Sequence, residues 1–343
     1  MKYVNVESVE AGEILGKTVY SGNGMVLLSA GVQLTVFMVS TLKRIGATML
    51  YIQDEAYQDV DTEDILDEAT KRAIIQEMSV TLEAVRSGKE WSPKKIAVSI
   101  DKLLNDVLSG RELLVQLTDI RSKDNALYIH AMNVCLLSSV IGLNMGLNYN
   151  QLKDLAVGAL LHDIGKVADD PGGKPAANSS LHHTWRGFEL IKAKREFSLH
   201  TAHVALQHHE CVDGSGMPRG IKGKDIHTFA KIVAVADVYD NAINGSSGRM
   251  LLPHEACEEM MAMSGRSLDR DVLIEFNRNV SIYPNGTAVR LSTKETGVIV
   301  KQHRGLPGRP VVRIARGSSR YDLDVVEVDL AVHTTVFIEA VLA

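Results

Sequence analysis

The chain has few of the residues that mark several common classes of protein. It holds three cysteines among 343 residues, and Cys135, Cys211 and Cys257 are widely spaced. Such a set predicts neither a disulfide framework nor a paired-cysteine zinc knuckle, and it fits the reducing cytoplasm. The formal net charge is only -5, so no general attraction to a nucleic acid polymer or to an anionic membrane is expected.

Long apolar runs are also missing. The opening residues, MKYVNVESVEAGEILG, contain no continuous apolar region of the kind that a signal peptide needs. The most apolar stretch near the middle, Val134–Leu147, is interrupted by serine, asparagine and glycine, and it is too short and too polar to span a bilayer. We therefore expect a cytoplasmic protein without a membrane span.

Sequence patterns divide the chain into four parts. Residues 1–54 alternate short β-like runs with turns and one helical stretch, which predicts a small α+β module. Residues 55–95 are charged and helix-forming and predict a helical connector, which packs on its own chain or, as the weaker alternative, joins a homodimer. Residues 96–278 repeat apolar stripes at helical spacing, one of them over Arg111–Ile120. Residues 279–343 are rich in valine and threonine and predict a β-rich segment, so the fold class is mainly α.

The helical part is rich in histidine. Nine of the twelve histidines lie between His130 and His227, and several adjoin a carboxylate. One buried histidine is usually a packed core residue, but a buried imidazole–carboxylate pair costs desolvation energy unless something pairs with it. Helical bundles build dinuclear metal centres from one inward ligand on each of several helices. The mixed ligand set suits iron, manganese, zinc or nickel and does not suit calcium.

The segment LLHDIGK, residues 160–166, shows this pattern most clearly. Neighbouring helical residues project about 100° apart, so His162 can bind one metal while the two oxygens of Asp163 bridge to a second. Gly165 permits a close approach of the backbone or of a ligand. Lys166 is a candidate for holding a phosphate oxygen. This helix end is predicted to form one wall of a metal site.

The order of the motifs along the chain carries a resemblance. His130, HDIGK, HTWRG, HHE followed by DGSGMPRG, and VAVADVYD resemble the HD superfamily of metal-dependent phosphohydrolases, and more narrowly the HD-GYP family of cyclic di-GMP phosphodiesterases. The flanks, VESVEAGEILGKTVYSGNGMVLLSAGVQLT and YPNGTAVRLSTKETGVIV, resemble segments that often border such domains. The resemblance implies an HD-type helical bundle, a cyclic dinucleotide substrate hydrolysed by metal-activated water, and a signalling protein as a partner.

Carried over position by position, the resemblance implies seven metal ligands: His130, His162, Asp163, His183, His208, His209 and Asp237. His162, Asp163 and His209, together with Lys166, are the expected catalytic residues. His183 is preferred to His182 as a ligand because it keeps the spacing to Gly187.

The number of metal ions follows from a different position. Ala126 stands where some members carry a glutamate for a third metal. Two divalent ions, iron or manganese, are therefore expected.

The substrate-contacting part departs from the family. The GYP motif reads Gly-Met-Pro here, and methionine has the volume of tyrosine without its hydroxyl. A basic segment that often follows VADVYD is replaced by NGSSGRMLL. The residues expected to contact substrate are Lys166, Gly216, Met217, Pro218, Arg219 and Arg249.

Three functions remain open at this point. The first is a metal-dependent phosphodiesterase that converts cyclic di-GMP, or a related cyclic dinucleotide, to linear pGpG, GMP or both. The second is a sensor that holds the nucleotide with little or no turnover. The third is an HD phosphohydrolase that acts on another nucleotide.

Overall fold

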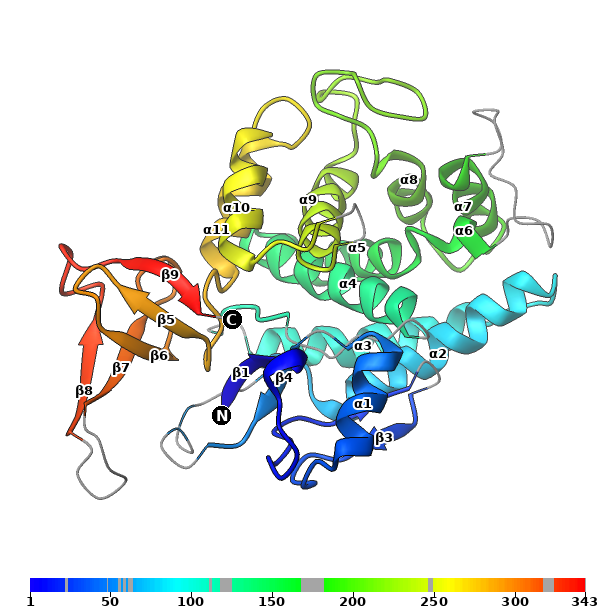
Figure 1. The fold of residues 1–343 in the computed structure, drawn as a ribbon. Coiled ribbons are helices and arrows are strands. Elements are labelled where there is room, and N and C mark those ends of the chain that lie inside the picture. Colours follow the sequence, from blue (N-terminus) through cyan, green and yellow to red (C-terminus); the bar gives the residue numbers. More distant parts are fainter. Residues whose placement is uncertain are drawn as a thin grey trace. The chain divides into compact units, whose positions relative to one another are not determined.

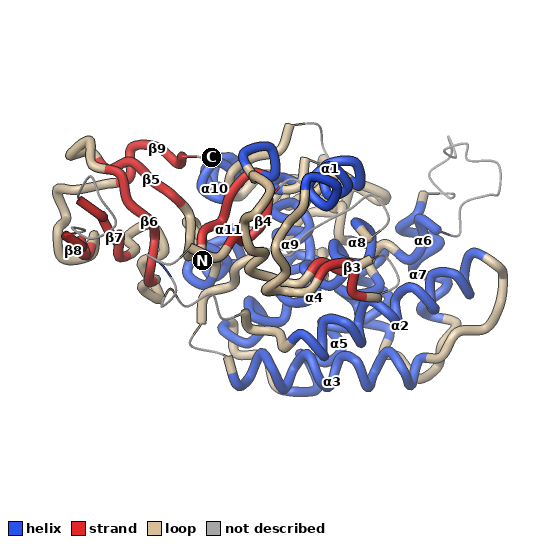
Figure 2. The backbone as a smooth tube through the Cα atoms, turned by 60° about the horizontal axis from the view of Figure 1, so that its bottom comes forward, coloured by secondary structure: helices blue, strands red, loops and turns tan. Residues whose placement is uncertain are grey.

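The computed structural model describes the chain except for residues 22–23, 48, 55–56, 58–59, 61–63, 111–112, 118–124, 168–181, 246–248, 317–323 and 343. Within it the chain forms two compact units. One comprises residues 1–64, 112–126 and 278–343, and the other comprises residues 65–111 and 127–277. The sheets belong to the first unit and nearly all of the helices to the second (Figures 1 and 2). The four-part division by sequence stays a prediction.

The helical unit is built from ten helices among the described residues. They are α2 (Glu68–Arg86), α3 (Pro93–Ser109), α4 (Ala126–Asn144), α5 (Tyr149–Leu161), α6 (Ile164–Val167), α7 (His183–Lys192), α8 (Leu199–Gln207), α9 (Thr228–Ile243), α10 (Pro253–Ala262) and α11 (Arg270–Asn279). Helix α2 packs along α3, which in turn contacts α5, while α8 contacts α5, α7 and α9. The mainly α fold class predicted from the sequence is confirmed.

Helix α4 is the core helix of this unit. Every residue from Ile129 to Gly142 is buried, which is expected of a helix that is apolar on all sides. Ala126–Asn144 is longer than the stretch considered from sequence, and by length and composition it could cross a membrane. However, 78% of its apolar window is buried inside the protein, so its apolar surface is accounted for by packing in this domain.

Glycines and a helix cap place α5 between α4 and α8. Asn148 and Gln151 form a reciprocal capping box that starts α5. A Cβ atom on Gly142 of α4 would lie 2.6 Å from Leu155 Cδ2, and one on Gly158 would lie 2.7 Å from Val204 Cγ2 of α8. The absence of a side chain at these two positions lets α5 pack closely against α4 and α8.

The other unit contains the strands. Near the N-terminus β1 (Lys2–Asn5) pairs with β4 (Met49–Ile52), β2 (Val19–Tyr20) pairs with β3 (Val26–Leu28), and α1 (Val36–Ile45) ends at Gly46 in the left-handed region. The C-terminal part is an antiparallel sheet in the order β8-β7-β6-β5-β9. Its strands are β5 (Ala288–Leu291), β6 (Thr296–Lys301), β7 (Val311–Arg316), β8 (Asp324–Asp329) and β9 (Ile338–Leu342). The predicted β-rich segment and small α+β module are confirmed.

The predicted helical stripe over Arg111–Ile120 is wrong for the residues that the structure describes there, 113–117. The Val115 N–H donates to the Asn279 carbonyl at 2.8 Å, and the Ser281 N–H donates to the Val115 carbonyl at 2.9 Å. Val115 therefore makes a parallel bridge to Val280, and both valines are buried. A pairing between residues far apart in the sequence overrides the local helical spacing.

Candidate metal centre

Two helix ends present histidines in the same way. His162 follows the last residue of α5, and its Nδ1 lies 2.7 Å from the Ala159 carbonyl oxygen. His208 follows α8, and its Nδ1 lies 3.0 Å from the Ala205 carbonyl oxygen. A carbonyl oxygen can only accept, so each Nδ1 must donate a proton. The Nε2 of each ring is then the nitrogen that can offer a lone pair to a metal once it carries no proton.

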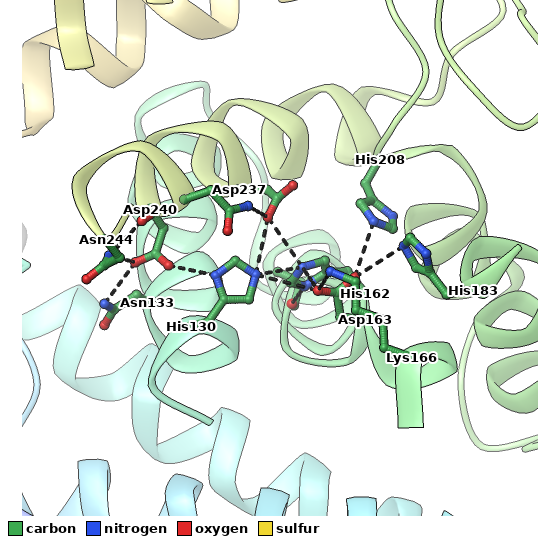
Figure 3. A network of polar contacts seen from close by, with 12 residues as sticks. His130, Asn133, His162, Asp163, Lys166, His183, His208, Asp237, Asp240 and Asn244 are labelled. Carbon is green, nitrogen blue, oxygen red and sulfur yellow. Dashed lines mark hydrogen bonds and ion pairs between the residues drawn. The ribbon is translucent and has the colours of Figure 1, made fainter. Parts of the chain in front are cut away.

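The Asp163 carboxylate lies between two sets of these nitrogen atoms (Figure 3). Its Oδ2 is 3.4 Å from His162 Nε2 and 3.6 Å from His130 Nε2. Its Oδ1 is 3.4 Å from His183 Nε2 and 3.6 Å from His208 Nε2. One carboxylate therefore faces a different pair of histidines with each of its oxygens.

Two ligand groups follow from these contacts. The His130 group consists of His130, His162, Asp163 and Asp237, whose Oδ1 lies 3.2 Å from His130 Nε2. The His183 group consists of Asp163, His183, His208 and His209, whose donor atoms all lie within 4.8 Å of one another. All seven residues predicted as ligands are thus brought together, with Asp163 shared. The structure supports the notion that these groups could bind metal, and their role as ligands stays a prediction.

Unpaired buried atoms test whether a cation fits this site. Asp163 Oδ1, His183 Nε2 and His208 Nε2 are buried and have no hydrogen-bond partner among the described residues. An isolated buried polar atom costs free energy, of the order of 1–3 kcal/mol. All three atoms can donate a lone pair, and they face one another across 3.4–3.6 Å. A divalent cation between them would satisfy all three at once, so the residues fit a metal.

The two carboxylates of the His130 group need positive charge close by. Burial would lower the pKa of His130, but the hydrogen bonds that it donates to Asp163, Asp237 and Asp240 raise that pKa to about 11. Burial likewise opposes protonation of His162, yet the charge of Asp163 raises the pKa of His162 to about 9. Burial would raise the pKa of Asp163 and Asp237, but the neighbouring histidines hold both carboxyl pKa values well below their usual range. Without a metal, protons on the imidazoles balance the two carboxylates.

The His183 group is electrostatically different. Burial lowers the pKa of His183 to about 3. The charge of Asp163 opposes this shift, while the charges of His208 and Lys166 add to it. Burial, followed by the charge of His208, lowers the pKa of His209 to about 2. Both imidazoles are therefore neutral at ordinary pH, which is the state that a metal ligand requires.

Close backbone packing places His183 beside Asp163. A Cβ atom on Gly165 would lie 2.0 Å from the His183 carbonyl oxygen and 2.7 Å from the Gly187 nitrogen. Gly165 thus allows the backbones of α6 and α7 to touch. His182 caps α7 by accepting from the Thr184 N–H at 3.4 Å. These contacts agree with the preference for His183 over His182 as a ligand.

The loop after the His-His pair is anchored on Glu210. The Glu210 side chain is buried, and its carboxylate accepts from the Arg219 N–H at 2.8 Å and from the Ile221 N–H at 3.1 Å. The Met217 N–H donates to the His209 carbonyl at 3.0 Å. A Cβ atom on Gly216 would lie 2.2 Å from the Cys211 nitrogen. The loop is therefore held tightly next to His209.

The expected substrate contacts lie at more exposed positions. Lys166 Nζ pairs with Asp163 Oδ2, and its side chain is 45% exposed. Met217 is 56% exposed, and Arg219 and Pro218 lie in the same loop. Arg249 pairs with Glu255 at 2.8 Å, and within the described part of the chain it forms no ion pair with either ligand group. The preceding residues, 246–248, lie outside the described part of the chain.

Two residues that hold parts of this site in place were not singled out from the sequence. One is Glu210, which was noticed only as part of the HHE motif. The other is Asp240, which is fully buried and lies 2.6 Å from His130 Nδ1. The spacing of Asp237 and Asp240, three residues apart on α9, could have suggested that both point inward.

The helical unit brings the ends of several helices together around groups of histidine and aspartate side chains, an arrangement typical of metal-binding domains. Comparison with known proteins shows which family this domain resembles. Residues 114–272 match the HD domain family, and residues 288–343 match the family described as a KOW domain associated with HD domain. HD domain proteins are metal-dependent. The chain therefore contains a segment that matches the HD domain, and its curated relatives are named cyclic di-GMP phosphodiesterases, which confirms the resemblance predicted from the motifs.

Curated relatives cover part of the chain. A cyclic di-GMP phosphodiesterase of Pseudomonas aeruginosa is 31% identical over 60% of this chain and 51% of its own. A cyclic di-GMP phosphodiesterase of Thermotoga maritima is 32% identical over 48% of this chain and 47% of its own. A 3'3'-cGAMP-specific phosphodiesterase of Vibrio cholerae is 28% identical over 47% of this chain and 33% of its own. The chain therefore spans about half the length of the first two relatives.

A solved structure shares the fold. An HDG"Y"P protein from Bdellovibrio bacteriovorus matches with a TM-score of 0.52 at 18% identity, over 80% of this chain and 97% of that one. At this identity the match shows the fold alone.

Proposed function

We propose that the protein is a metal-dependent phosphodiesterase that hydrolyses cyclic di-GMP, or a related cyclic dinucleotide, to linear pGpG, GMP or both. The observation that carries the proposal is the Asp163 carboxylate, whose two oxygens face His162 Nε2 and His183 Nε2 at 3.4 Å each. Relatives named for cyclic di-GMP and for 3'3'-cGAMP support the class of substrate.

The two ligand groups would hold one divalent ion each, with Asp163 shared. Five imidazoles and two carboxylates make up the seven proposed ligands, a donor set that suits iron or manganese. Bound ions of this kind supply a water of lowered pKa and positive charge for the phosphoryl oxygens. The absence of a glutamate at Ala126 supports two ions rather than three.

The protein's own residues would orient the reactants. Helix-end carbonyls fix the imidazoles of His162 and His208, as described above, so that both Nε2 atoms point inward. Lys166 is anchored by Asp163 yet partly exposed, which leaves its ammonium group able to contact a phosphate oxygen of the substrate. The loop tied down by Glu210 would keep Met217 and Arg219 close to His209 of the His183 group.

The decisive experiment combines metal analysis with product analysis. The purified protein, loaded separately with Mn²⁺ and with Fe²⁺ under anaerobic conditions, is incubated with cyclic di-GMP and with 3'3'-cGAMP, and the products are separated by chromatography. We expect about two metal ions per chain, as in dinuclear hydrolases, and linear product from at least one substrate. Asp225→Asn serves as a matched control, because Asp225 is exposed and lies outside both ligand groups. Metal-loaded protein that hydrolyses neither substrate contradicts the proposal.

One observation favours a second candidate function, a cyclic dinucleotide sensor. The side chain that replaces the family tyrosine, Met217, is 56% exposed, and Arg249 is engaged by Glu255. Two of the expected substrate-contacting residues thus differ from the family pattern or are engaged elsewhere, while all seven proposed ligands are present. A sensor would bind the nucleotide with metals loaded and release no linear product. An HD phosphohydrolase acting on another nucleotide would instead be recognised by turnover of a different substrate.

We also propose that the protein works in the cytoplasm. Cys135, Cys211 and Cys257 are all free thiols, which fits the cytoplasm. A homodimer or a signalling protein remains the expected partner.

A further inference from the structure

Asp240 is a buried carboxylate that the proposed ligand set does not use. It lies on α9 three residues after Asp237, and it is 0% exposed. Its Oδ2 is 2.6 Å from His130 Nδ1. Figure 3 shows the imidazole of His130 between Asp240 on one side and His162 with Asp163 on the other. Asp240 therefore touches the nitrogen of His130 that faces away from the ligand group.

Two amide groups hold the Asp240 carboxylate in place. Asn133, one helical turn after His130 on α4, donates from Nδ2 to Asp240 Oδ1 at 3.0 Å. Asn244 donates from Nδ2 to the Asp240 carbonyl at 2.6 Å and lies 3.5 Å from the same Oδ1. With Oδ1 accepting from these amides, Oδ2 is directed at His130. The carboxylate can only accept, so His130 must carry a proton on Nδ1.

This contact decides what His130 can do at its other nitrogen. His130 Nε2 lies 3.2 Å from Asp237 Oδ1 and 3.2 Å from His162 Nε2. It can bind a cation there only if the proton sits on Nδ1. A carboxylate behind a metal-binding histidine fixes the tautomer and the ring orientation and makes the imidazole a stronger donor.

We propose that Asp240 is a positioning residue that sets the tautomer and orientation of His130 and thereby the affinity of the His130 group for its metal ion. It binds no metal and touches no substrate itself. The inference rests on the proposed dinuclear function and adds the residue that prepares one of its two positions.

The test is Asp240→Asn in the full chain. Asn133 and Asn244 both donate toward Oδ1, so the new side chain keeps its oxygen there and turns its NH₂ toward His130. An NH₂ group donates, so His130 Nδ1 must become the acceptor and the proton moves to Nε2, where the metal should bind. We expect the Mn²⁺ affinity of the weaker-binding position to fall roughly 10–100-fold, and the metal content after dialysis to fall from about two ions to about one.

The measurements are Mn²⁺ affinity by chelator competition, metal content, and the Tm of the metal-free protein. Asp269→Asn is the matched control. It makes the same aspartate-to-asparagine change in the same unit, and it removes the 3.0 Å ion pair between Asp269 and Lys231 of α9, away from both ligand groups. A merely structural role for Asp240 would lower the metal-free Tm of Asp240→Asn and leave its Mn²⁺ affinity as high as that of wild type and of Asp269→Asn. Unchanged affinity in Asp240→Asn therefore overturns the inference.

A second variant guards against misfolding. Asn133→Ala removes one amide donor and leaves the carboxylate charge in place. We expect it to weaken Mn²⁺ binding less than Asp240→Asn does, and wild-type affinity in it overturns the inference if Asp240→Asn cannot be purified. Wild-type protein that binds no divalent metal overturns the proposed function itself. Wild-type protein that binds metal alongside an equally competent Asp240→Asn overturns only the role of Asp240.

Discussion

His183 Nε2 lies 3.4 Å from Asp163 Oδ1, and both atoms are buried without a hydrogen-bond partner among the described residues. Asp163 directly precedes α6 and His183 begins α7, and the two helices meet because Gly165 lets their backbones touch. Two buried polar atoms without a hydrogen-bond partner cost free energy, and a cation bound between them would satisfy both. This contact links the fold to the proposed metal centre, and substitutions in and around it test that proposal.

The first prediction concerns the shared carboxylate. Asp163→Asn keeps the shape of the side chain and removes a charge that both ligand groups use. We expect the variant to lose bound metal and all hydrolysis, and to melt at a lower temperature than metal-loaded wild type, because metal binding contributes to folding free energy. Metal content, product formation and Tm are the measurements, with Asp225→Asn as the control. Full metal content together with normal turnover would exclude a bridging role.

The second prediction concerns pH. The pKa values of His130 and His162 are raised to about 11 and about 9 because neighbouring carboxylates outweigh burial. In the metal-free protein both rings therefore hold a proton that a metal ion must displace. Because metal binding releases these protons, the apparent affinity for Mn²⁺ should increase as the pH rises toward 9, by up to about tenfold per pH unit for each proton released. Chelator competition between pH 6.5 and 8.5 measures this trend, and an affinity independent of pH contradicts it.

The sequence allowed the local part of this site to be predicted. His162 and Asp163 are neighbours in the chain, and the helical rotation of about 100° per residue points their side chains in different directions. Asp240 could not be assigned in this way, because its role depends on contact with His130, which lies 110 positions earlier. The error at Arg111–Ile120 has the same origin. Val115 is buried by pairing with Val280, and no local spacing reports such a contact.

The third prediction concerns the loop anchor. Glu210 accepts from two backbone N–H groups with its two carboxylate oxygens. In Glu210→Gln one of these oxygens becomes an NH₂ group, which cannot accept, so one N–H is left unsatisfied at a cost of about 1–3 kcal/mol. We expect a looser loop, a KM several times higher and little change in metal content. Steady-state kinetics and metal analysis measure the two effects. Loss of metal in Glu210→Gln would show that the residue supports the ligand groups instead of the loop.

The last prediction concerns Met217, which occupies the position of the family tyrosine. Its N–H is fixed to the His209 carbonyl, while its side chain is 56% exposed. Replacing it with tyrosine adds one hydroxyl, and one hydrogen bond contributes about 0.5–1.5 kcal/mol in ordinary cases.

That amount corresponds to little more than a factor of ten in rate at most. We therefore expect Met217→Tyr to change cyclic dinucleotide turnover less than tenfold, and His209→Ala to remove turnover because it takes a donor from the His183 group. Product formation by both variants at equal metal loading makes the comparison. If metal-loaded wild type is inert and Met217→Tyr alone restores hydrolysis, the protein is a sensor whose turnover is limited at this loop, because the ligand groups are complete in both forms.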